Sequence, residues 1–195
     1  MPMAVKYSPL AAVETISTGS AKPKLFVVRF MDEREKKDTV GRMNNAYGGK
    51  VKTLVTTDDI GLILAEATTD ALRKAGLEAE LHSDRTSGQT IPSEERNGFD
   101  YVIGGRIKEV EVVTQPGWDT LRIKARIVVD ILIAKGDQSE WIGPIEGAGE
   151  RRDYIILQGS SLTESLDGAI QNCMRDMIRH HKASGTLQPE AKARK

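Results

Sequence analysis

The clearest pattern along the chain is a strict alternation of apolar and polar residues over positions 121–133. Apolar side chains occupy every second position, and basic residues such as Arg122 and Lys124 lie between them. A period of two residues predicts a β-strand with one buried face. Val128 and Leu132 interrupt the polar set, so we expect the far end of this strand to be covered on both faces.

Shorter runs rich in β-branched and aromatic residues predict the other strands. These runs lie at 24–30, 51–56, 77–81, 101–113, 141–142 and 150–157. Pro116-Gly117 and Gly136-Asp137 are typical of turns between strands. Residues 40–49 mix Asn and Gly with few apolar residues, which predicts an irregular excursion.

Two segments have the period of an amphipathic helix. The first is predicted to begin after a Thr57 N-cap and to end at Gly76, because glycine accepts the left-handed conformation that closes a helix. Ser161 and Glu164 have the spacing of a capping box and predict the start of the second helix. Its apolar stripe comprises Leu162, Leu166, Ala169, Ile170, Cys173, Met174, Met177 and Ile178.

This order of elements predicts an α+β domain. We expect an antiparallel twisted sheet of about four to five strands with two amphipathic helices packed on one face. The length of 195 residues suits one domain with tails. We therefore predict an extended amino-terminal arm at 1–23, a single α+β domain at 24–182, and a flexible tail at 183–195, where little apolar surface is available to bury.

Charge and hydropathy exclude some classes of partner. The chain has 28 basic and 28 acidic residues, so no net charge attracts nucleic acid, and we predict no nucleic-acid partner. Its apolar runs are far shorter than the roughly 20 residues that span a bilayer. The first ten residues lack the pattern of a secretory signal. We expect either a cytoplasmic protein or a sequence that starts after a removed signal.

The residues that could carry chemistry have simpler structural interpretations. His180 and His181 are adjacent on a helix and point about 100° apart, which does not suit chelation of one metal. Cys173 lies on an apolar stripe, where a buried thiol is the common case. Gly104-Gly105 lies inside a strand and opens no helix, so close backbone packing or a bulge is expected there instead of a phosphate loop. We predict no catalytic residue, cofactor or metal.

Three aromatic residues are the candidate partner contacts. Trp118 and Trp141 lie beside turn residues, and Tyr47 lies in the 40–49 excursion. An indole ring combines a large contact area with one donor, which suits a binding surface. For the two tryptophans, simple packing at a strand end is the favoured alternative.

Several segments, taken together, resemble the YajG-type lipoprotein family over about Val5 to His180. They are LFVVRFMDER, TTDDIGLILAEATTDALRKAGLEAE, YVIGGRIKEVEV, RIKARIVVDILIAKG and SLTESL. The resemblance implies an envelope protein tethered to the periplasmic side of the outer membrane by a lipidated cysteine, with a domain similar to the amino-terminal domain of TolB. The lipobox of that family is missing from this sequence, so either the leader was removed or this member is not a lipoprotein.

The functional expectation is a non-enzymatic, periplasmic scaffold or adaptor. It presents a sheet edge, its loops or both to a protein partner or to its own copies, and the arm at 1–23 could pair with a neighbour. A small-molecule or glycan-binding module is the alternative, with a pocket between the 83–98 loop and the sheet. An enzyme is less favoured than either of these, and nucleic-acid binding less still. The residues alone leave a cytoplasmic location open.

Overall fold

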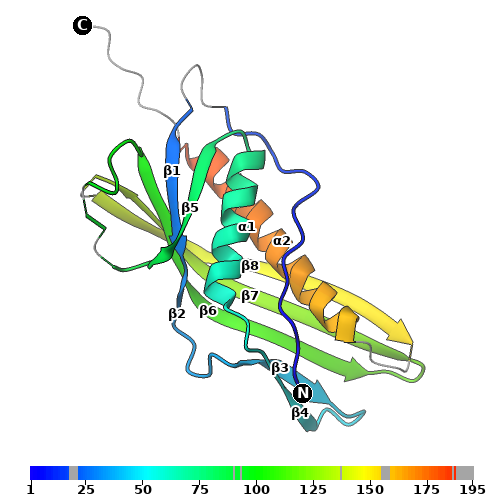
Figure 1. Ribbon diagram of the computed structural model, residues 1–195. Coiled ribbons are helices and arrows are strands. Elements are labelled where there is room, and N and C mark those ends of the chain that lie inside the picture. Colours follow the sequence, from blue (N-terminus) through cyan, green and yellow to red (C-terminus); the bar gives the residue numbers. More distant parts are fainter. Residues whose placement is uncertain are drawn as a thin grey trace, which may run out of the picture.

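The structure is a computed structural model that describes residues 1–17, 22–89, 91–92, 94–136, 138–154, 159–185 and 187. It is a mixed α+β fold in which two helices cover one face of a curled sheet (Figure 1). The elements, in chain order, are β1 (Lys24–Arg29), β2 (Met31–Asp32), β3 (Thr39–Asn44), β4 (Lys50–Val55), α1 (Ile60–Lys74), β5 (Glu78–Thr86), β6 (Tyr101–Pro116), β7 (Thr120–Lys135), β8 (Gln138–Tyr154) and α2 (Gly159–Ser184).

The class of the fold was predicted, but the sheet is larger than expected and is not purely antiparallel. It has eight strands, and β6 pairs in parallel with β1, β2 and β3 and antiparallel with β7. The reason is the length of β6, which takes β1 as its partner near Val102 and β3 near Val113. One strand of 16 residues therefore joins two smaller groups of strands.

Two parts of the chain are more regular than predicted: the 40–49 segment and the segment after residue 140 both form well-defined strands. The 40–49 excursion contributes most of β3 and the turn to β4, and the two form an antiparallel hairpin. The segments expected to supply one or two short strands after residue 140 belong, as far as Tyr154, to the single strand β8, which pairs with β7 along its length, and residues 155–157 of the prediction lie outside the described part of the chain. The 83–98 loop is shorter than expected, because β5 continues to Thr86.

Helix α1 forms where the apolar period predicted it, but its N-cap is Asp59 and not Thr57. The Asp59 carboxylate accepts a hydrogen bond from the backbone N–H of Leu62 at 2.9 Å. Gly76 follows the helix with a φ of 94°, as expected for a glycine that closes a helix.

Helix α2 begins at Gly159, so Ser161 lies inside its first turn and the predicted capping box is wrong. The carboxylate of Glu164 pairs with Arg151 of β8 instead. The predicted stripe from Leu162 to Ile178 is buried. The helix lies directly on β8, where an added Cβ at Gly147 would overlap the carbonyl oxygen of Ala169.

Residues 1–17, which we call the amino-terminal segment, run beside both helices (Figure 1). Thr163 of α2 donates to the carbonyl of Ala4, and the backbone N–H of Ile16 donates to Ala75 at 2.9 Å. This segment therefore follows both helices from their first turns to the end of α1. Its buried apolar side chains are Met3, Val5, Leu10 and Ile16.

The opposite face of β1 carries a second, smaller core. It consists of Phe26, Val28, Val102 and Ile91, with Phe99 packed against it. The segment that follows β5 contributes Ile91 and Phe99 and so covers this part of the sheet. On the same strands, an added Cβ at Gly104 would overlap the Ser87 hydroxyl and one at Gly105 would overlap the Phe30 ring, which confirms close packing at this glycine pair.

The predicted tail at 183–195 lies outside the described residues after the end of α2, apart from Gly185 and the buried Leu187.

Candidate functional site

Two hairpin turns lie at the same end of the sheet. Strands β3 and β6 run in parallel and pair from Gly41 opposite Val112 to Met43 opposite Thr114. Both strands end within a few residues of this pairing, so the β3–β4 turn and the β6–β7 turn project from neighbouring positions. Residues far apart in the sequence are thereby brought to one surface.

Each of these turns presents an aromatic side chain to solvent. Tyr47 in the β3–β4 turn is 98% exposed and Trp118 in the β6–β7 turn is 101% exposed. Val51 on β4 adds a further exposed apolar side chain, at 57%. We call Tyr47, Val51 and Trp118 the hairpin end. It contains three of the five exposed large apolar residues among those that the structure describes.

The backbone around these aromatic residues is held by local hydrogen bonds. The Asn45 side chain accepts from the N–H groups of Tyr47 at 3.0 Å and Gly49 at 2.8 Å. In the other turn, the N–H of Gly117 donates to the carbonyl of Thr120 at 2.6 Å. The two aromatic rings are therefore carried on closed turns.

A hollow of about 530 Å³ lies on the solvent face of the sheet beside the hairpin end. Val113 of β6 and Ala148 of β8 contribute apolar surface to it. The helices pack on the opposite face, because the neighbouring residues Val112 and Ile123 belong to the main core. We call this feature the sheet hollow, and its charged lining residues are Arg42, Glu111, Lys124, Arg126 and Glu150.

Most of the charges around the sheet hollow neutralise one another. Arg42 pairs with Glu111 at 2.7 Å and Arg122 pairs with Glu150 at 3.2 Å. Lys124 lies between these pairs and has no ion-pair partner among the residues that the structure describes. Its ammonium is therefore the uncompensated charge of the hollow. Sequence analysis placed Lys124 on a polar strand face but had no signal for the hollow, which depends on the pairing of four strands.

Arg126 joins the hollow to the next part of the sheet. Its guanidinium binds Glu146 at 2.7 Å and also pairs with Glu109. The hydrogen bond from Arg126 lowers the pKa of the Glu146 carboxyl, so that this pair remains charged near neutral pH.

The structure does not bring Trp141 to the hairpin end. Trp141 lies on β8 opposite Leu132 and is 38% exposed. The guanidinium of Arg106 lies 3.9 Å from the centre of its ring, and Arg106 also pairs with Glu33 at 3.3 Å. Trp141 thus already has a cationic partner in its own chain.

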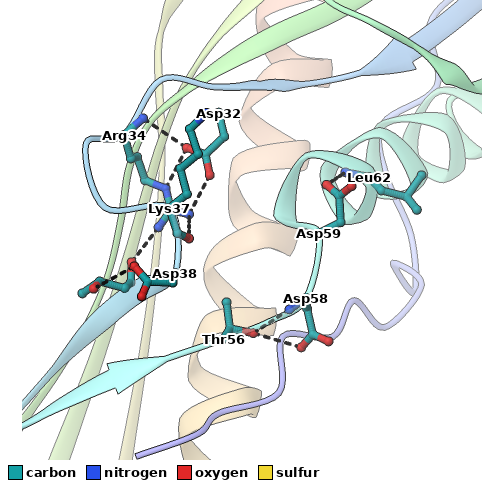
Figure 2. A network of polar contacts seen from close by, with 9 residues as sticks. Asp32, Arg34, Lys37, Asp38, Thr56, Asp58, Asp59 and Leu62 are labelled. Atoms are coloured by element: carbon teal, nitrogen blue, oxygen red, sulfur yellow. Dashed lines mark hydrogen bonds and ion pairs between the residues drawn. The ribbon is translucent and has the colours of Figure 1, made fainter.

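The charged segment after β2 forms a closed network next to the start of α1 (Figure 2). Arg34 donates to both carboxylate oxygens of Asp32, at 2.9 and 2.7 Å, and to the backbone carbonyls of Lys37 and Thr39. Both carboxylate oxygens of Asp32, which a metal cation would need as ligands, are therefore already bound to Arg34. Among the described residues, no group of three His, Cys, Asp or Glu side chains could hold a metal ion.

Of the two histidines of α2, His181 lies in the core, and so does Cys173. Burial raises the pKa of the Cys173 thiol to about 12 and lowers the pKa of the His181 imidazole to about 4. Cys173 is therefore a protonated thiol and His181 a neutral ring near pH 7. Both side chains are buried within the main fold, away from the hairpin end and the sheet hollow.

The pocket predicted beside the 83–98 loop is small. A hollow of about 170 Å³ lies there, bordered by Arg96, Phe99, Tyr101 and Ala134. Sites for small molecules commonly have volumes of about 300 Å³ or more. No helix in the described part of the chain has the length and apolar character needed to cross a membrane.

Comparison with known proteins places the chain in a class of fold. No family model matches the sequence, and no curated protein matches it. Among solved structures, protein XCC0632 from Xanthomonas campestris, of the DUF330 family, matches with a TM-score of 0.54 and 10% identity over 95% of this chain and 96% of that one. At this identity the likeness shows a shared fold.

Two further structures are more distant. A neuraminyllactose-binding hemagglutinin homologue from Helicobacter pylori has a TM-score of 0.43 and 9% identity, over 93% of this chain and 96% of that one. A PelC dodecamer from Paraburkholderia phytofirmans has a TM-score of 0.39 and 15% identity, over 85% and 96%. These two scores are too low to support an argument about this chain. Membership of the YajG-type family stays a prediction.

Proposed function

We propose that the protein is a non-enzymatic scaffold or adaptor of the bacterial envelope that binds a protein partner through the hairpin end. The observation that carries this proposal is the placement of Tyr47 and Trp118, both fully exposed, on two adjacent closed turns. Large aromatic side chains are enriched among the residues that dominate protein interfaces. Exposure of the apolar surface of the whole indole ring to water is unfavourable in free energy, and burial of the ring against a partner would remove this cost.

Two observations support a binding role over catalysis. The ionisable groups of α2 with strongly shifted pKa values, Cys173 and His181, are buried in the core. The acidic and basic residues around the sheet hollow form mutual ion pairs, which suits a structured surface. The periplasmic location rests on the resemblance to envelope lipoproteins.

Site-specific photo-crosslinking would test the proposal. A photoreactive phenylalanine analogue is incorporated at Trp118, at Tyr47 or at Trp141, and cells that produce the full chain are irradiated. We expect protein adducts from Trp118 and Tyr47. The Trp141 position is the matched control, because it replaces the same residue type on a strand where Arg106 already occupies the ring face. If neither position of the hairpin end gives a protein adduct above this control, the proposal fails.

A further inference from the structure

We infer that the partner is a second copy of this chain, with the hairpin end of each copy seated in the sheet hollow of the other. This inference rests on the proposed function, because it assumes that the hairpin end binds protein. It adds the identity of the partner and the surface that receives the aromatic side chains.

Trp118, which we call the knob, lies in the turn of the β6–β7 hairpin, and the two strands of this hairpin also supply part of the lining of the sheet hollow. Gln115 lines the sheet hollow, and Trp118 follows three residues later in the β6–β7 turn. Trp118 lies in the turn just before β7, and from Thr120, where β7 begins, to Lys124 the strand extends about 13 Å at a rise of roughly 3.3 Å per residue. Two copies that face each other in antiparallel orientation can therefore place each turn over the other hollow around one two-fold axis. Such an interface is closed and self-complementary.

The lining of the hollow suits an aromatic ring. Val113 and Ala148 offer apolar contact, and beside them lies the ammonium of Lys124, which has no ion-pair partner in the described part of the chain. A cation is attracted to the face of an indole ring, most strongly when the contact excludes water. The chain already contains one such contact, between Arg106 and Trp141. A volume of about 530 Å³ leaves room for a large side chain.

The charge pattern favours a second copy over a strongly charged partner. Arg42, Arg122 and Arg126 alternate with the glutamates that they bind, so this face has few uncompensated charges. Two such faces can approach without strong repulsion, and ion pairs at the rim can exchange partners between copies. An anionic membrane or a nucleic acid would instead meet the glutamates of this face.

Trp118 fluorescence and sedimentation provide the test. The chain has two tryptophans, so Trp141→Phe leaves Trp118 as the only indole. We expect this variant to dimerise as the parent chain does, with Trp118 emission moving to shorter wavelength as the dimer forms. Trp118→Ala and Lys124→Glu should each weaken dimerisation at least tenfold, whereas Lys124→Arg, which keeps the cation, should preserve it.

A mixing experiment tests the reciprocal geometry. Each single variant loses both knob-and-hollow contacts in its own dimer, but a mixed pair of Trp118→Ala and Lys124→Glu chains retains one intact contact. The mixed pair should therefore form more tightly than either variant alone. Because the altered side chains are exposed, equal thermal unfolding midpoints would show that the variants are folded.

The possible outcomes separate this inference from the proposed function. A chain that remains monomeric at all concentrations, or a dimer that is insensitive to both substitutions, overturns the inference. If Trp118 then crosslinks to a different protein, the proposed function stands and only the identity of the partner is wrong. Recruitment of Trp118 to anionic vesicles without dimerisation would also overturn the inference. Loss of every protein adduct would overturn both.

Discussion

The hydroxyl of Tyr7 donates a hydrogen bond of 2.6 Å to the Asp70 carboxylate, and this contact fixes the amino-terminal segment to α1. Asp70 also accepts from the backbone N–H of Leu10 at 3.2 Å and pairs with Lys74 at 3.0 Å. Lys74 in turn donates to the carbonyl of Leu10. The carboxylate is thus the centre of a network that holds the segment on the helix.

Replacement of Tyr7 by Phe should lower the free energy of unfolding by about 1 to 2 kcal/mol, because Asp70 loses one charged hydrogen bond while its other donors remain. Urea unfolding measures the change. Tyr47→Phe is the matched control, since the Tyr47 side chain is 98% exposed and should be neutral. Equal stability of the Tyr7→Phe variant and the parent chain would show that the segment is not held by this bond.

Packing of α2 on β8 depends on a glycine. A methyl group at Gly147 would overlap the carbonyl of Ala169 and approach the Cys173 side chain. Gly147→Ala should therefore force the helix away from the strand and cost roughly 1 to 3 kcal/mol. Gly159→Ala places the same methyl group where nothing lies within 4 Å, and its thermal unfolding midpoint should stay within a degree or two of the parent. Similar midpoints for both variants would contradict this account of the helix–strand contact.

Local patterns were sufficient to predict the helices and most strands. The stripe of α2 and the alternation of β7 each reflect burial of one side of an element, so the period alone identifies them. Exact helix starts were less predictable. Thr57, Asp58 and Asp59 are all acceptable N-caps, and the structure selects Asp59 while Asp58 binds the backbone N–H of Val5.

The candidate site could be predicted only residue by residue. Tyr47 and Trp118 are recognisable as aromatic residues in turns, but their proximity follows from the parallel pairing of β3 with β6. The sequence has no local signal for that choice of partner, because parallel strands are joined through long connections. The same limit applies to the sheet hollow, whose lining comes from four strands.

Stability should fall in acid because of His181. Its ring is buried, neither nitrogen has a hydrogen-bond partner among the described residues, and burial lowers its pKa to about 4. The unfolded chain binds a proton near pH 6.5, so a fall in pH from 7 to 4 favours unfolding by up to about 3 kcal/mol. Above pH 7 this penalty is absent.

Replacement of His181 by Leu should remove this part of the pH dependence. We expect unfolding free energies at pH 5 and pH 8 to lie closer together in this variant than in the parent chain. His180→Gln is the comparison, because the exposed His180 makes only the smaller, electrostatic contribution to the lowered pKa of His181 and most of the pH dependence should persist in this variant. An unchanged difference between the two pH values in the His181→Leu variant would assign the acid sensitivity to other groups.

The Cys173 thiol should resist modification in the folded protein. Burial, with a smaller contribution from Asp176, raises its pKa to about 12, so almost no thiolate exists at pH 8, and the side chain is covered by the α2–β8 contact. Reaction with a chromogenic disulfide reagent therefore requires opening of this contact. We expect slow modification in buffer, rapid stoichiometric modification in urea, and an intermediate rate in Gly147→Ala. Rapid modification of the native parent chain would mean that α2 is not packed on β8 in solution.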